Sequence, residues 1–65
     1  MKIRVNSEAR EVRGQNLAEV LDELGYGGAV VATAVNGDFA PARARADVIL
    51  KEGDEVELLA PMRGG

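Results

Sequence analysis

The sequence predicts an α+β fold in which one main helix packs across a mixed sheet of four to five strands. One observation is size, because 65 residues suit a single domain near the lower limit for folding on a hydrophobic core alone. Another is that strand-like segments lie on both sides of one segment with helical periodicity. A helix with one apolar stripe buries that stripe by packing on a sheet, so this order of segments is typical of a β-grasp fold.

The first segments are expected to form an N-terminal β-hairpin. Residues 2–6 alternate polar and apolar side chains, the period of a half-buried strand, so Ile3 and Val5 would face the core. Turn-forming residues occupy positions 6–8. Residues 9–12 can then return as the second strand.

The next segment is predicted to be the main helix. Asn16 stands at the N-cap position, and Glu19 occupies the third helical position, as in a capping box. Gly25 can adopt the left-handed conformation that ends a helix. Four large apolar side chains recur at i, i+3, i+4 and i+7 and form one stripe, which we interpret as part of the core. They are Leu17, Val20, Leu21 and Leu24.

A second hairpin is expected after a loop that contains glycine. Residues 30–35 are rich in β-branched side chains and predict a strand. Asn36 and Gly37 follow, which is the strongest short signal for a tight hairpin turn. A short return strand can begin at Phe39 and would end at Pro41, because proline cannot donate a ladder hydrogen bond.

The following segment is expected to return the chain to the core. Residues 42–46 can form a helical turn, in which we interpret Arg43 and Arg45 as a solvated face. Residues 47–50 then lead back toward the core, and residues 51–54 form a turn.

Residues 55–59 are predicted to be the last strand, with Val56 and Leu58 on its buried side. In a β-grasp sheet the first and last strands lie side by side at the centre and run parallel, with the helix as part of the crossover. Four carboxylates accompany this strand, and we interpret them as a solvated edge that would steer a basic partner surface. They are Glu52, Asp54, Glu55 and Glu57.

Composition argues against several classes of function. Without cysteine or histidine the chain has no disulfide framework, no thiolate or imidazole metal site, and no usual general base. A net charge of −3 argues against nucleic-acid binding by phosphate neutralisation. No apolar run is long enough to span a bilayer and no signal-peptide core is seen, so the expected location is the cytoplasm, away from membranes. These features favour a small carrier or binding module with no bound cofactor or metal.

The last residues are expected to be the chemically active part. We divide the chain into a domain at residues 1–60 and a flexible tail at residues 61–65. Pro61 would end strand pairing and stiffen the tail, which would project about 16 Å. Gly64 and Gly65 carry no Cβ, so they can lie extended in a narrow channel. The Gly65 carboxylate could attack the α-phosphate of ATP and form an acyl-adenylate for capture by a thiol, an amine or sulfide.

Three stretches of the sequence form a specific combination. They are the V-N-G-x-x-x-P pattern within residues 34–41, the K-E-G-D turn and strand within residues 50–59, and the Gly-Gly ending of residues 60–65. Together they resemble the ThiS family of sulfur carriers in thiamine biosynthesis, over essentially the whole chain. The resemblance implies a ubiquitin-like β-grasp fold and a carrier protein that is not an enzyme and has no catalytic residue of its own.

The resemblance also implies a chemistry and its partners. An E1-like adenylyltransferase of the ThiF type would use ATP and Mg²⁺ to adenylate the Gly65 carboxylate. Sulfur from a sulfur donor protein would then give a C-terminal thiocarboxylate, which a thiazole synthase of the ThiG type would consume. The residues that would thread into a partner are Pro61, Met62, Arg63 and Gly64.

Several alternatives stay open on the sequence. The small subunit of molybdopterin synthase, a MoaD-like carrier, shares the fold, the tail and the thiocarboxylate chemistry. A non-conjugating β-grasp interaction module would carry its glycines incidentally. Arg63 would pair with an acidic residue or a phosphate in the activating enzyme, or would be a solubilising charge. Met62, Leu59 and Ala60 would form an apolar docking patch, or Leu59 would belong to the core.

Overall fold

Strands from the first and last described parts of the chain meet at the centre of one sheet. The computed structural model describes residues 1–28 and 30–59. The elements are β1 (Lys2–Val5), β2 (Glu8–Glu11), α1 (Leu17–Glu23), β3 (Ala32–Val35), β4 (Asp38–Ala40), the 3₁₀ helix η1 (Ala42–Asp47) and β5 (Glu55–Leu59). Within these residues the sheet has five strands in the order β2-β1-β5-β3-β4. The predicted central pairing is confirmed, because β1 and β5 are parallel neighbours.

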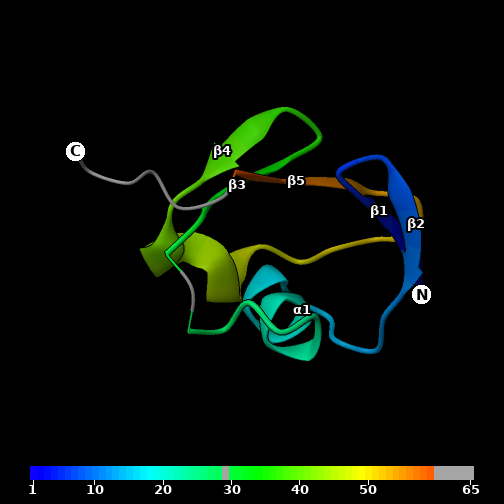
Figure 1. The fold of residues 1–65 in the computed structure, drawn as a ribbon, viewed down its shortest axis with the longest axis horizontal. Helices are drawn as coiled ribbons and strands as arrows, with labels where there is room; N and C mark the ends of the chain where they lie inside the picture. Colours follow the sequence, from blue (N-terminus) through cyan, green and yellow to red (C-terminus); the bar gives the residue numbers. More distant parts are fainter. Residues whose placement is uncertain (29, 60–65) are drawn as a thin grey trace.

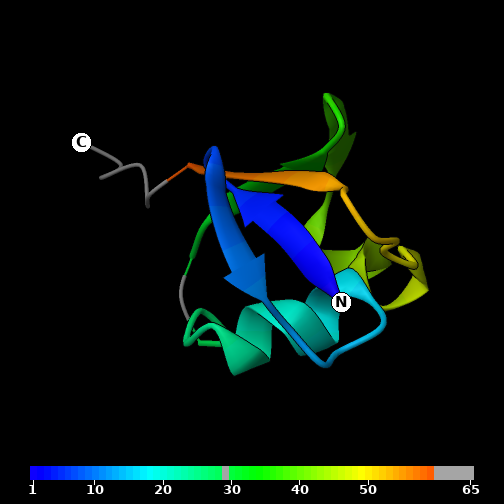
Figure 2. The same ribbon diagram turned by 90° about the vertical axis from the view of Figure 1, so that its right-hand side faces the viewer.

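Helix α1 covers one face of the sheet and leaves the other face open (Figure 1, Figure 2). The 3₁₀ helix η1 lies on the same side of the sheet as α1 and contacts it (Figure 1). This arrangement confirms the predicted α+β fold with one main helix on a mixed sheet. The buried apolar residues between the layers are Ile3, Val5, Val12, Leu17, Val20, Leu21, Ala40, Leu50, Val56 and Leu58.

The N-terminal hairpin is confirmed, with a tighter turn than the sequence suggested. Val5 pairs with Glu8, so the turn consists of Asn6 and Ser7 alone. These two residues have φ angles of 50° and 72°. Positive φ at both central residues is the type I′ geometry, whose twist matches that of the flanking strands. The second strand therefore begins one residue earlier than predicted, and Val12 lies beyond it in the core.

Helix α1 begins and ends as predicted. Asn16 Oδ1 accepts a hydrogen bond from the N–H of Glu19 at 2.8 Å, which confirms the N-cap. The Glu19 carboxylate accepts from the N–H of Gln15 at 2.9 Å, one residue before the position that a capping box would use. Gly25 follows the helix with φ of 93°. The stripe faces the core, with three residues buried and the fourth partly buried: Leu17, Val20, Leu21 and Leu24, in that order.

The second hairpin has the predicted turn but a shorter first strand. Asn36 and Gly37 have φ angles of 51° and 88°, again positive at both central residues. Strand β3 begins at Ala32, two residues after the predicted start at Val30, which is 78% exposed and lies outside the ladder. Strand β4 ends just before Pro41, as predicted.

The solvated-face interpretation is wrong for Arg45. Its Nε donates to Thr33 Oγ1 at 3.1 Å, and a terminal nitrogen donates to the Val31 carbonyl at 2.6 Å. Thr33 Oγ1 in turn donates to the Ala40 carbonyl at 2.7 Å, so this buried hydroxyl both donates and accepts. Arg45 therefore ties η1 to the start of β3, whereas Arg43 is exposed as predicted.

The solvated-edge interpretation is also wrong for Asp54, which precedes β5. Asp54 is 9% exposed and accepts hydrogen bonds from Asn36 Nδ2 at 3.0 Å and from the Lys51 N–H at 2.8 Å. Glu52 is exposed as predicted, and it accepts a hydrogen bond from the N–H of Lys2 at 2.9 Å. Asp54 therefore joins the turn before β5 to the turn that carries Asn36, whereas Glu52 joins the same turn to β1.

Candidate functional site

Along β5, successive side chains point to opposite faces of the sheet, and this decides which of them reach the open face. Val56 and Leu58 point toward α1 and are buried, as predicted. The alternate residues Glu55, Glu57 and Leu59 therefore lie on the open face. Leu59 is 64% exposed, so the alternative interpretation of this residue as core is wrong. The last strand thus ends with a large apolar side chain in solvent.

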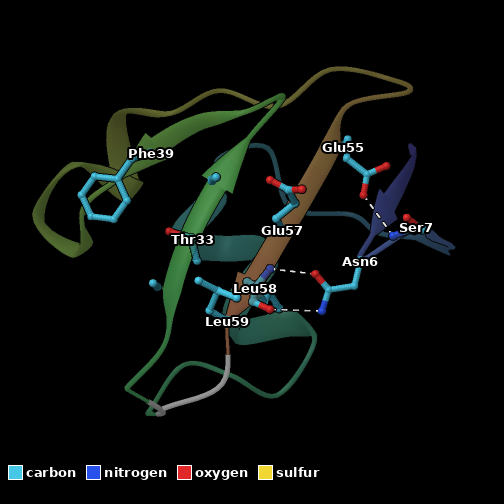
Figure 3. Close-up of a pocket in the computed structure, with 10 residues that line it drawn as sticks. Asn6, Ser7, Thr33, Phe39, Glu55, Glu57, Leu58 and Leu59 are labelled. Atoms are coloured by element: carbon cyan, nitrogen blue, oxygen red, sulfur yellow. Dashed lines mark hydrogen bonds between the residues drawn. The ribbon is translucent and has the colours of Figure 1, made fainter. Parts of the chain in front are cut away.

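A groove of about 420 Å³ lies on the open face beside Leu59. The small side chains of Ala32 and Ala34 form its floor. Ala32 lies opposite Leu59 on β5, and Ala34 lies opposite Phe39 on β4. Phe39 is 71% exposed, and Figure 3 shows its ring at the side of the groove that β4 forms. Two large apolar side chains separated by alanines leave a hollow that a side chain of another protein can fill.

The opposite side of the groove is formed by the turn after β1. Asn6 Nδ2 donates to the Leu58 carbonyl at 3.2 Å, and the Leu58 N–H donates to Asn6 Oδ1 at 2.8 Å (Figure 3). On its other edge, β5 pairs with β3 up to Leu59. The final residues of β5 are therefore held from both sides.

Polar side chains fix the turn that carries Asn6. Glu55 accepts hydrogen bonds from Arg4 Nε at 3.1 Å and from the Ser7 N–H at 3.0 Å. Arg4 also donates from a terminal nitrogen to the Ser7 carbonyl at 3.0 Å. The Arg4–Glu55 ion pair is exposed and adds little stability by itself. Together with the bonds that both side chains make to the backbone of Ser7, it orients the turn. Glu57 is exposed as predicted, and Glu55 is partly exposed and makes these hydrogen bonds at the surface.

A second asparagine fixes the start of β5. Asn36 Oδ1 accepts from the N–H of Glu55 at 2.9 Å, while its Nδ2 donates to Asp54. Burial raises the pKa of the Asp54 carboxyl, but the hydrogen bonds from Asn36 and from the Lys51 N–H outweigh it and leave the pKa below its ordinary value. Asp54 is therefore ionised at neutral pH and keeps both bonds.

Of the residues predicted for the site, Leu59 is the one that the described chain contains. It lies on the rim of the groove, and its docking role stays a prediction. The other predicted site residues lie outside the described residues, and their roles also stay predictions. They are Ala60, Pro61, Met62, Arg63, Gly64 and Gly65.

Sequence reasoning missed two residues of the groove. Phe39 could have been found, because a two-residue turn at Asn36 and Gly37 places it opposite Ala34, on the face away from the core. Asn6 could not have been found in this way, because no local pattern relates it to the end of β5.

The groove is a contact surface made by described residues. Within residues 1–28 and 30–59, no group of three or more carboxylates is arranged to hold a metal ion. In the same part of the chain, no helix is both long and apolar enough to cross a bilayer. What the groove can do chemically is receive an apolar side chain beside the end of β5.

Comparisons with known proteins agree with one another. A family model described as the ThiS family matches residues 3–65. The sulfur carrier protein ThiS of Thermus thermophilus is 38% identical over 61 residues, which cover 94% of this chain and 95% of the relative. A crystal structure of a thiamine biosynthesis protein (ThiS) from Geobacter metallireducens has a TM-score of 0.84 and 33% identity, and covers 100% of both chains. A solution structure of a thiamine biosynthesis protein from the same organism has a TM-score of 0.77 and 32% identity, and covers 100% of this chain and 88% of the other.

Proposed function

The chain belongs to the ThiS family, and on this premise we propose that it is a sulfur carrier of thiamine biosynthesis whose Gly65 carboxylate receives the sulfur. The observation that carries the proposal is the extent of the family match, which runs from residue 3 through Gly65 and so includes the diglycine. The family also accounts for the ubiquitin-like β-grasp fold, which the solved structures share over the whole chain.

The first step of the proposed reaction activates the carboxylate. A carboxylate oxygen of Gly65 attacks the α-phosphate of ATP, the bond to the β-phosphate breaks, and pyrophosphate leaves. An E1-like adenylyltransferase of the ThiF type binds ATP and Mg²⁺ and supplies the groups that stabilise the developing charge. The carrier acts as a substrate, which fits a chain that has neither cysteine nor histidine.

The second step exchanges oxygen for sulfur. Sulfur from a sulfur donor protein attacks the acyl carbon, and AMP leaves with the oxygen that bridged it to the carbon. Where the donor presents a persulfide, a thiol supplies the two electrons that release the donor. The resulting thiocarboxylate is a better nucleophile than a carboxylate, and a thiazole synthase of the ThiG type consumes it. Since the reaction uses ATP, we place it in the cytoplasm.

The groove supports this proposal because a partner that holds Gly65 needs a second contact on the folded domain. Leu59 precedes Gly65 by six residues, which span about 20 Å when extended. A partner with its active site at that distance can fill the hollow between Phe39 and Leu59. Through such a contact a partner would recognise the carrier, although the carrier places no side chain of its own at the reacting carboxylate.

Intact-protein mass spectrometry tests the proposed chemistry. The protein is incubated with the ThiF-type enzyme, ATP, Mg²⁺ and the sulfur donor, and we expect a mass gain equal to the exchange of one oxygen for sulfur. The matched control lacks Gly64 and Gly65, and we expect it to keep its melting temperature and to lose ATP–pyrophosphate exchange.

Other outcomes would identify the alternatives. A protein that binds the activating enzyme but never gains sulfur would be an interaction module. A charged protein that supplies a large molybdopterin synthase subunit and not a thiazole synthase would belong to the molybdopterin pathway. The names of the relatives favour the thiamine pathway.

A further inference from the structure

The end of β5 extends beyond the backbone reach of its parallel neighbour. The β1–β5 pairing joins Arg4 to Glu55 and Val5 to Val56, and the last backbone bond on this edge runs from the Asn6 N–H to the Val56 carbonyl at 2.9 Å. The chain then turns away into β2. Without a substitute, the N–H and the carbonyl of Leu58, the next residue of β5 that faces this edge, would have no partner in the sheet.

The Asn6 side chain supplies that substitute. Its carboxamide donates to the carbonyl of Leu58 and accepts from the N–H of the same residue, as one more paired strand residue would do. This arrangement depends on the turn, where Asn6 has φ of 50° and Ser7 is anchored to Glu55. Asparagine tolerates this left-handed conformation better than most residues do.

We propose that Asn6 is a positioning residue for the carrier reaction, an inference that rests on the proposed function. Its carboxamide fixes Leu58 and so keeps the end of β5 ordered. The next residue, Leu59, lies on the rim of the groove, and the reacting carboxylate of Gly65 follows six residues later in the sequence. A partner that engages both the groove and Gly65 would otherwise have to order this strand end during docking. Removing the carboxamide therefore weakens recognition of the carrier and leaves the chemical step unchanged once the complex has formed.

The chain contains a matched control at the other end of the same strand. Asn36 also occupies the first position of a turn with positive φ, and its carboxamide also makes two hydrogen bonds, to Asp54 and to the N–H of Glu55. Glycine accepts positive φ without strain, so Asn6→Gly and Asn36→Gly each delete a carboxamide and keep the turn. The first change loosens the end of β5 near the tail, and the second loosens its start.

The test measures ATP–pyrophosphate exchange by the ThiF-type enzyme with the full chain as the varied substrate, well below the melting temperature of every variant. For Asn6→Gly we expect KM for the carrier to rise about tenfold, the factor that one to two net hydrogen bonds carry, with kcat within about twofold of wild type. For Asn36→Gly we expect KM to stay within about twofold. In the isolated protein, amide exchange at Leu58 should accelerate in Asn6→Gly and stay unchanged in Asn36→Gly.

A further variant separates the two hydrogen bonds. Asn6→Asp keeps the acceptor for the Leu58 N–H but loses the donor to the carbonyl, so its KM should lie between those of wild type and Asn6→Gly. If wild type is activated while Asn6→Gly and Asn36→Gly have the same KM, the positioning role of Asn6 is overturned and the carrier function stands. If wild type itself is never activated, the proposed function fails and this inference fails with it.

Discussion

Asn6 makes with Leu58 the two hydrogen bonds that a neighbouring strand would make, although 52 residues separate the two in the sequence. Asn36 makes a similar pair of bonds to Asp54 and Glu55 at the other end of the same strand. The central strand is therefore fixed at each end by the asparagine of a hairpin turn. This gives the proposed carrier a firm base from which its last residues continue.

The hydrophobic core should be sensitive to a single truncation on α1. Leu21 is 2% exposed, and Leu21→Ala leaves a cavity that we expect to lower the free energy of unfolding by about 2–5 kcal/mol. That is a large share of the stability of so small a domain. Urea denaturation followed by circular dichroism measures the change. Leu59→Ala is the control, because Leu59 is 64% exposed and its truncation should cost less than about 0.5 kcal/mol. Equal losses in the two variants would contradict this assignment of the core.

The groove should matter for partner binding and not for folding. We expect Leu59→Ser and Phe39→Ser to raise KM for the carrier in the activation assay by about tenfold, because each removes an apolar contact at the groove. Ile49→Ser is the matched control, since Ile49 is 65% exposed and lies outside the groove. If the Ile49 variant loses as much activity as the other two, the groove is not the docking surface.

The turn after β1 contains a residue in an unfavourable conformation. Ser7 has φ of 72°, a left-handed geometry that costs a residue with a Cβ about 1–2 kcal/mol. Both hydrogen bonds of Ser7 described above use its backbone, so Ser7→Gly keeps them and removes the strain. After allowing for the greater freedom of glycine in the unfolded chain, we expect a gain of up to about 1 kcal/mol. The melting temperature measures this gain, and a fall would show that the Ser7 side chain stabilises the turn.

Two carboxyl groups have a lowered pKa in the folded protein and should therefore make its stability depend on pH. The pKa of Glu23 is lowered by hydrogen bonds from the N–H groups of Gly14 and Arg13. In Asp54 burial raises the pKa, but the hydrogen bonds from Asn36 and from the Lys51 N–H dominate and lower it. A pKa that is lower in the folded than in the unfolded state adds stability above the unfolded value, and this stability is lost as pH falls through the folded value.

We therefore expect the free energy of unfolding to be steady above about pH 5 and to fall below about pH 4. Urea titrations from pH 7 to pH 3 measure this dependence. Asp54→Asn should be less stable at pH 7, because an amide cannot accept both bonds as well as a carboxylate does, and its stability should depend less on pH. An unchanged pH dependence in that variant would show that Asp54 does not contribute to it.

Most elements of the fold could be predicted because their signals are local. The spacing of Leu17, Val20 and Leu21 identified the helix, and Asn16 marked its start. The Asn36-Gly37 pair identified a hairpin turn. Strand boundaries are harder to predict where strand and loop residues share the same pattern. The return strand of the first hairpin begins one residue earlier than predicted, and β3 begins two residues later than the predicted Val30.

The sequence by itself determined the faces of β5, the order of the elements and the resemblance that led to the proposed function. Each of these depends on residues that are neighbours along the chain, where periodicity and turn geometry act directly. Only the tertiary structure decided that Asn6 bonds Leu58, that Arg45 bonds Thr33 and that Asp54 is buried beside Asn36. These contacts depend on strand register and on how distant elements pack together, so they form only when the whole sheet and the helix are in place.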